Sequence, residues 1–232
     1  MSYFAATRHP WACFVFLLPL LAVYEVGVVW IGGPVAARNG ADAWLRWCLE
    51  RYGLPTLVAA PLLIVSYFLL RSLWNWKGRP DRILSVGFGM LVESLAYAVL
   101  LWLISCNFHL VLDHCGIVLQ IPSPQAKAVV TYIGAGIYEE AIFRLGLFSL
   151  LVFLMRLVLL PTPAAVMLGA ALAAVAFAAA HHLGPYGEPI IAEVFVVRFL
   201  AGLVFTALYV FRGFGLAVGA HAGYDVLVGV AV

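Results

Sequence analysis

Acidic, basic and imidazole side chains gather in three apolar stretches of the second half of the chain. The first stretch, YIGAGIYEEAIFRLGLF, holds Glu139, Glu140 and Arg144. Glu140 and Arg144 are four residues apart, so on a helix they share a face and can form an ion pair. Glu139 lies about 100° around the helix and has no such neighbour, which makes it a candidate general base. The alternative for this cluster is a structural ion-pair network that ties helices together.

Each of the other two stretches carries a histidine four residues away from a second candidate site residue. In VMLGAALAAVAFAAAHHLG, Phe177 and His181 share a face with alanines, which allow close packing of membrane helices. In HAGYD, His221 and Asp225 are four residues apart, so the carboxylate can fix the orientation of the imidazole. The alternatives are a capping or interfacial role for His181 and a structural hydrogen-bonded pair for His221 and Asp225.

The three stretches contain motifs in a defined order. EEAIFR has the form EExxxR, FAAAH the form FxxxH, and HAGYD the form HxxxD. Together they resemble the CAAX-protease and bacteriocin-processing family of intramembrane endopeptidases, which includes type II CAAX prenyl endopeptidases and abortive-infection-like proteins. The resemblance covers residues 125 to 231. It implies that Glu140, Arg144 and Phe177 support the site.

The resemblance also implies the catalytic roles. Glu139 would activate a water molecule, while His181 and His221 would position it and stabilise the oxyanion. To share one water, these three side chains should lie within about 6 Å of one another, with Glu140 and Arg144 directed away from it. Many family members have Asn where this chain has Asp225, so Asp225 either orients His221 or acts while protonated. In a zinc-dependent variant, Glu139, His181 and His221 would hold the metal and leave the fourth position for water. We favour the form without a cofactor, because the motifs lack the HExxH arrangement of two ligands on one helical face.

The amino-acid composition predicts the environment in which the chain folds. Of the 232 residues, 65% are hydrophobic and 10% are charged, and the mean hydropathy is +1.06. Soluble domains carry roughly 25% charged residues, so the predicted environment is the lipid bilayer. The net charge of +2 forms no basic stripe, which argues against nucleic acid as a partner. The predicted partner is a membrane-associated peptide or protein substrate, lipidated or not.

The predicted fold is an all-α polytopic membrane helix bundle of about eight transmembrane helices in one integral membrane domain. Residues 1–124 supply the first three transmembrane helices, and residues 125–232 form the catalytic core. An interfacial amphipathic helix is expected near 35–52, where charged residues alternate with Trp and Leu. The predicted transmembrane helices lie near 11–31, 55–74, 83–105, 125–146, 146–160, 163–183, 190–212 and 214–231. No clear break separates the fourth of these from the fifth, so the number of helices there is open.

Charge in the loops predicts the orientation. Residues 71–82 include four Lys and Arg residues, whereas residues 105–124 include none. The positive-inside rule then places both termini, and the site, on the cytoplasmic side of the cell membrane. The helices that carry Glu139, His181 and His221 would all run toward the cytoplasm. The outer segment 105–124 would hold a disulfide between Cys106 and Cys115 in preference to a metal site.

Two functions without proteolysis are also compatible with the sequence. One is a non-catalytic membrane immunity or binding protein of the same fold. The other is a proton-coupled carrier that uses Glu25, Glu93 and the glutamates of the EExxxR motif. For Glu25 and Glu93 themselves, a structural partnership with an arginine or a backbone group is the favoured interpretation.

Overall fold

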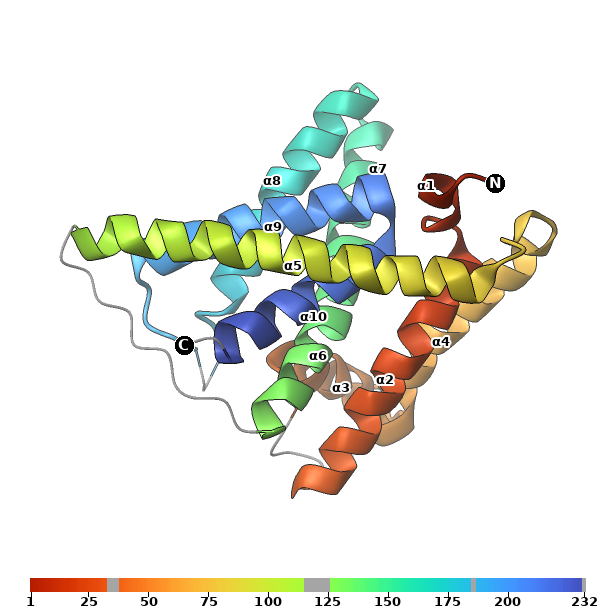
Figure 1. Cartoon of the computed structure of the whole chain (residues 1–232), viewed down its shortest axis with the longest axis horizontal. Coiled ribbons are helices and arrows are strands. Elements are labelled where there is room, and N and C mark those ends of the chain that lie inside the picture. Colours follow the sequence, from red (N-terminus) through yellow and green to blue (C-terminus); the bar gives the residue numbers. More distant parts are fainter. Residues whose placement is uncertain (33–37, 115–125, 185–186, 231–232) are drawn as a thin grey trace.

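The computed structural model describes residues 1–32, 38–114, 126–184 and 187–230 (Figure 1). Its described part consists of helices and their connections, with no strand, so the predicted all-α class is confirmed. The elements are α1 (Tyr3–Ala6), α2 (Pro10–Gly32), α3 (Gly40–Arg51), α4 (Thr56–Trp74), η1 (Trp76–Gly78), α5 (Ile83–His114), α6 (Ala126–Glu140), η2 (Ala141–Phe148), α7 (Ser149–Leu157), α8 (Thr162–Ala180), α9 (Ala192–Arg212) and α10 (Phe214–Val230).

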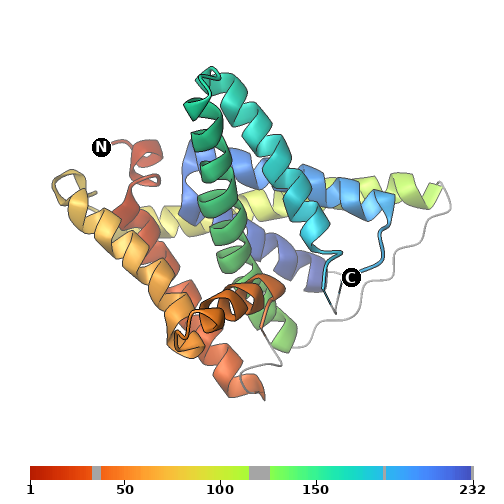
Figure 2. The ribbon, with the colours of Figure 1, turned by 180° about the vertical axis from the view of Figure 1, so that it is seen from behind.

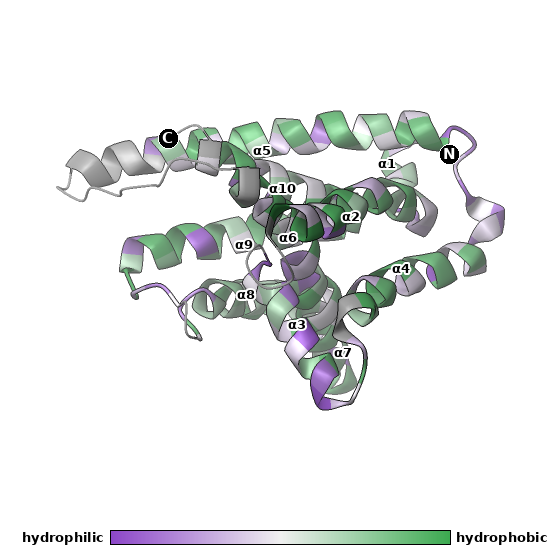
Figure 3. Cartoon of the chain, turned by 90° about the horizontal axis from the view of Figure 1, so that it is seen from below, coloured by the Kyte–Doolittle hydropathy of each residue, from purple (hydrophilic) through white to green (hydrophobic). Residues whose placement is uncertain are grey.

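Four of the described helices are long and apolar enough to cross a membrane. They comprise Pro10–Ile31, Ile83–Asn107, Thr162–Ala180 and Ala192–Arg212, and Val58–Trp74 is a shorter apolar helix. Figure 3 shows apolar residues along the helices, while polar ones gather on α3 and in connections such as that between α4 and α5. These helices and their composition indicate an integral membrane protein.

One predicted boundary is wrong. The sequence analysis separates helices 125–146 and 146–160, but the chain continues as a helix from α6 through η2 into α7. No proline interrupts this part of the chain, so the backbone hydrogen bonding is kept. It changes instead to the wider π-helical form over η2. Such π-helical turns are rare and are often found at functional sites, and this one begins directly after Glu140.

The continuous helix reverses at a short connection and forms a hairpin with α8 (Figure 2). Leu159, in this connection, has a positive φ of 62°. Glu139 lies 18 residues before Leu157, and His181 lies 19 residues after Thr162. The two arms therefore bring Glu139 and His181 to the same level. The expectation that these two helices run in the same direction is wrong, because the predicted break near residue 146 is absent.

Helix α10 lies inside the bundle and packs against α2, α5, α6 and α9. Its small residues allow close approach of the neighbouring helices, as expected in membranes. A Cβ atom added to Gly136 of α6 would lie 2.7 Å from Cβ of Ala222 and 2.8 Å from O of Val218. This contact brings the last turns of α6 against the part of α10 that carries His221.

The segment after residue 105 also differs from the prediction. Helix α5 continues to His114, so residues 105–114 are helical and not an outer loop. Cys106 has a free thiol in the described structure. Its predicted partner, Cys115, lies outside the described residues, and the disulfide therefore stays a prediction.

Helix α3 confirms that a helix lies within the predicted stretch 35–52, and it packs against α4 and α6. Its orientation was not anticipated. Asp42 and Arg46 are buried against the bundle, whereas Trp44 and Trp47 are exposed. The charged face is directed inward because it forms ion pairs with α2, and the location of α3 at the membrane interface stays a prediction.

Candidate active site

Glu139 lies in the last turn of α6, and its carboxylate has two different environments. Oε1 accepts a hydrogen bond of 2.7 Å from Nδ2 of Asn39. Oε2 is buried and has no hydrogen-bond partner among the described residues. It lies 3.8 Å from Nε2 of His181 and 3.8 Å from Nε2 of His221. The predicted convergence of Glu139 with both histidines, within about 6 Å for groups that share one water, is confirmed.

The orientation of His181 follows from its contact with the α8 backbone. Its Nδ1 lies 2.8 Å from the carbonyl oxygen of Phe177. Since a carbonyl oxygen only accepts hydrogen bonds, Nδ1 carries the hydrogen. Burial lowers the pKa of His181, which favours the neutral ring. Nε2 then has a free lone pair directed toward Glu139.

His221 is held by a glutamate. Its Nδ1 lies 2.7 Å from Oε1 of Glu140, and its Nε2 lies 3.5 Å from Oδ2 of Asp225 as well as near Glu139. The sequence suggests that Asp225 could orient His221, but Glu140 makes the shorter contact and does so from the opposite ring nitrogen. Asp225 lies on the same side of the ring as Glu139.

The EExxxR motif forms the expected ion pair. NH1 of Arg144 lies 2.9 Å from Oε1 of Glu140, and both side chains are buried. NH2 of Arg144 donates to the carbonyl oxygen of Gly202 at 3.1 Å, which connects the motif to α9. The expectation that Glu140 points away from the site is wrong, since the same oxygen contacts both Arg144 and His221.

Two phenylalanines enclose these polar groups. The Phe177 ring lies edge-on to His181, with centroids 5.0 Å apart, and the guanidinium of Arg144 lies 4.5 Å from its centroid. Phe205 of α9 stacks on His221 with a centroid distance of 4.3 Å and an interplanar angle of 14°. Phe177 was predicted from the FxxxH motif. Phe205 was not, because it belongs to no motif and only its position on the buried face of α9 distinguishes it.

The comparison with known families agrees with this geometry. Residues 122–227 match the family model described as Type II CAAX prenyl endopeptidase Rce1-like. This part of the chain is similar to the Rce1-like family. The family indicates a CAAX-type intramembrane protease. No curated protein and no solved structure matches the chain.

Asn39 contacts the site from outside the matched residues 122–227. It precedes α3 and is buried beside Glu139, from which it is separated by 100 residues of sequence. It was not among the predicted site residues. An asparagine before Gly40 is a typical helix cap, but nothing in the local sequence indicates contact with a residue so far along the chain.

The position of the site along α2 bears on the predicted orientation. Trp76, in the connection between α4 and α5, contacts Trp11 at the start of α2. Glu25 accepts a hydrogen bond from Tyr138, the neighbour of Glu139. Fourteen residues of helix separate Trp11 from Glu25, which corresponds to about 21 Å. The candidate site therefore lies toward the other end of α2 from residues 76–78, and the side of the membrane on which it opens stays a prediction.

The predicted zinc alternative would use Glu139, His181 and His221 as ligands. The described residues contain no group of three or more His, Cys, Asp and Glu side chains that could hold a metal ion. One oxygen of Glu139 is also occupied by Asn39. Oε2 of Glu139 and the Nε2 atoms of His181 and His221 stay without a direct bond to one another, so the zinc alternative stays a prediction.

Proposed function

We propose that the chain is an intramembrane endopeptidase in which Glu139 activates the water that hydrolyses a peptide bond. One observation carries this proposal. The unpartnered Oε2 of Glu139 faces Nε2 of both His181 and His221 at 3.8 Å. This separation is too long for a direct hydrogen bond, but a water molecule can contact all three groups.

In the proposed reaction, the Nε2 lone pair of His181 accepts a hydrogen bond from the water and Glu139 removes a proton from it. The water oxygen attacks the carbonyl carbon of the substrate and forms a tetrahedral oxyanion. Nε2 of His221, when protonated, donates a hydrogen bond to that oxyanion. The C–N bond then breaks, and Glu139 returns the proton to the leaving amine. No cofactor takes part.

Glu140, Arg144 and Phe177 have supporting roles in this proposal. The contact between Glu140 and His221 fixes which ring nitrogen faces the substrate. Arg144 compensates the buried charge of Glu140, and Phe177 packs against the guanidinium of Arg144. Asp225 is near enough to Nε2 of His221 to influence its hydrogen.

The carrier alternative has less support from the contacts. Arg46 and Tyr138 both bond to Glu25. Arg212 forms two hydrogen bonds with Glu93, of 2.6 and 2.7 Å. These arginine partnerships support the favoured interpretation of Glu25 and Glu93 as structural residues. A transported proton would have to break them.

The proposed substrate is a membrane-associated peptide or protein, with prenylated CAAX sequences as the first candidates because of the family match. We retain location in the cell membrane as part of the proposal. The count of eight spans and the cytoplasmic location of both termini depended on a break near residue 146. Because that helix is continuous, seven crossings with termini on opposite sides are the arrangement to test.

The experiment uses the purified full chain in lipid nanodiscs and an internally quenched peptide that ends in a farnesylated CAAX sequence. The parent protein should cleave it. Glu139→Gln should lose at least about 100-fold in rate, the range of general-base catalysis, with an unchanged melting temperature. Glu50→Gln, at an exposed position of α3, is the matched control and should retain activity. Undiminished cleavage by the Glu139→Gln protein would rule out the general-base assignment.

A further inference from the structure

Asn39 uses both ends of its amide group. Its Oδ1 accepts hydrogen bonds from the backbone N–H groups of Ala41 and Asp42, at 2.8 and 3.2 Å. Its Nδ2 donates to Oε1 of Glu139 at 2.7 Å. Because the carbonyl end caps α3, the orientation of the amide is determined by its partners. The NH2 group must face the carboxylate.

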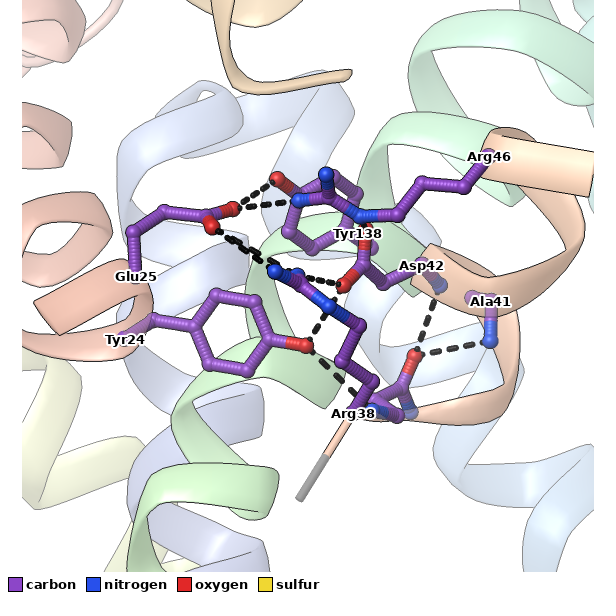
Figure 4. Close-up of polar contacts among 8 residues, drawn as sticks. Tyr24, Glu25, Arg38, Ala41, Asp42, Arg46 and Tyr138 are labelled. Carbon is purple, nitrogen blue, oxygen red and sulfur yellow. Dashed lines mark hydrogen bonds and ion pairs between the residues drawn. The ribbon is translucent and has the colours of Figure 1, made fainter. Parts of the chain in front are cut away.

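The cap itself is held in place by a buried polar network (Figure 4). Tyr24 of α2 accepts a hydrogen bond from the backbone N–H of Asn39 and donates one to Oδ2 of Asp42, at 3.3 and 2.8 Å. Oδ1 of Asp42 also accepts from Nε of Arg46 at 2.6 Å. The start of α3 is therefore connected to α2 through hydrogen bonds that surround Asp42.

The same network reaches the helix that carries Glu139. Glu25 accepts hydrogen bonds from Arg46 at 2.8 Å and from Tyr138 at 2.7 Å. Tyr138 is adjacent to Glu139, and Figure 4 shows it beside Glu25 and Asp42. Charges in this cluster are balanced by ion pairs, with Arg38 also 2.6 Å from Asp42. Asn39 is the member of this region that bonds to Glu139 itself.

We infer that Asn39 is a positioning residue for Glu139, an inference that rests on the proposed function. Its amide binds Oε1 and thereby selects Oε2 as the oxygen that faces His181 and His221. A carboxylate free to rotate would offer either oxygen and a range of angles to the water. The active site is consequently completed by the first half of the chain, outside residues 122–227.

Two substitutions separate the cap from the positioning contact. Asn39→Ser keeps a good helix cap but removes the donor to Glu139. We expect kcat for the farnesylated CAAX peptide to fall by about 10- to 100-fold, with KM unchanged. Asn39→Asp also keeps the cap, and at neutral pH it places a carboxylate against that of Glu139.

The pH profile distinguishes positioning from a purely structural role. In the Asn39→Asp protein, acidification lets the two carboxyl groups share a proton and restores a donor toward Glu139. The ratio of variant to parent kcat should therefore rise as the pH falls. A cap that served α3 alone would give a constant ratio. A constant ratio, or parental kcat in the Asn39→Ser protein, would overturn the inference while leaving the proposed function intact.

A measurement without substrate tests the hydrogen bond between Asn39 and Glu139 independently. Melting temperatures are compared for Asn39→Ser, Glu139→Ala and the double variant. The shift of the double variant should be smaller than the sum of the two single shifts, because either change removes the same hydrogen bond. Strict additivity would overturn the inference. Failure of the proposed function would instead be seen as no cleavage by the parent or full cleavage by the Glu139→Gln protein.

Discussion

Glu140 and His221 are joined by a contact of 2.7 Å between two buried side chains of α6 and α10. The same glutamate oxygen lies 2.9 Å from NH1 of Arg144. Breaking a buried ion pair leaves an uncompensated charge and costs about 3 to 5 kcal/mol. We therefore expect Glu140→Gln to lower the free energy of unfolding by that amount, measured by SDS titration.

The control for this prediction is Glu188→Gln. Glu188 also pairs with an arginine, Arg198, at 2.9 Å, but its side chain is 53% exposed. Exposed ion pairs contribute up to about 1 kcal/mol, so this substitution should change stability little. Equal destabilisation by the two substitutions would contradict the structural importance of the Glu140 contacts.

Gly136→Ala should separate α6 from α10. The added methyl group would meet backbone atoms of Val218 and Ala222 at 2.8 Å, and neither can move without the helix. Overpacking of this kind costs about 1 to 3 kcal/mol. Since Glu139 and Glu140 follow on the same helix, kcat should fall together with the melting temperature.

Gly87→Ala in α5 is the matched control for this substitution. A Cβ atom at Gly87 would have no neighbour within 4 Å. Alanine is favoured over glycine in helices by about 1 kcal/mol, so this protein should be at least as stable as the parent. A Gly136→Ala protein with parental stability and kcat would show that the close approach of α6 and α10 is not required.

Metal removal should leave the enzyme active. The proposed reaction uses Glu139 and two imidazoles without a cofactor, so dialysis against 1,10-phenanthroline is expected to leave kcat unchanged. Elemental analysis of the purified protein checks the same point. One zinc ion per chain, together with activity that is lost in chelator and restored by zinc, would contradict the metal-free mechanism.

Labelling can test the orientation of the bundle. In a background without the native cysteines, Gly78→Cys and Ile190→Cys should react with a membrane-impermeant maleimide from opposite sides. Residue 78 is at the end of the bundle where α2 begins, and Ile190 follows His181 after a short connection. Labelling of both from one side would contradict this fold.

The side that labels residue 78 then decides the location of catalysis. The positive-inside rule places the Lys- and Arg-rich residues 71–82 in the cytoplasm. In that case the site opens toward the other side of the membrane. If residue 190 is labelled from the cytoplasm, the site faces the cytoplasm as the sequence analysis expected, and the charge rule fails for this chain.

Sequence spacing was sufficient for features that depend on one helix or one motif. The ion pair of Glu140 and Arg144 follows from a separation of four residues, and hydropathy identified most helices to within a few residues. The continuity through residue 146 was missed because apolar residues run through it without a stop signal, and hydropathy does not register a π-helical segment. The relative direction of α6 and α8 was wrong as a consequence.

Contacts between segments that are distant in the sequence could not be predicted from spacing and hydropathy. Asn39 and Phe205 reach Glu139 and His221 from elements without a recognisable motif. Periodicity indicates which face of a helix is buried, but not which residue of another helix covers it. Without such contacts, the sequence assigned the orientation of His221 to Asp225 because it is the nearest acid along the chain.

The hairpin of α7 and α8 places a constraint on chain length. Glu139 and His181 are level because the arms that lead to and from Val158–Pro161 have nearly equal numbers of residues. One residue inserted into α8 alone would turn His181 by about 100° and shift it by about 1.5 Å. Exchanges among apolar residues on the lipid-facing sides keep this length. Insertions and deletions in these arms should therefore be far less tolerated than substitutions, although neither arm contains a catalytic side chain between Ser149 and Ala176.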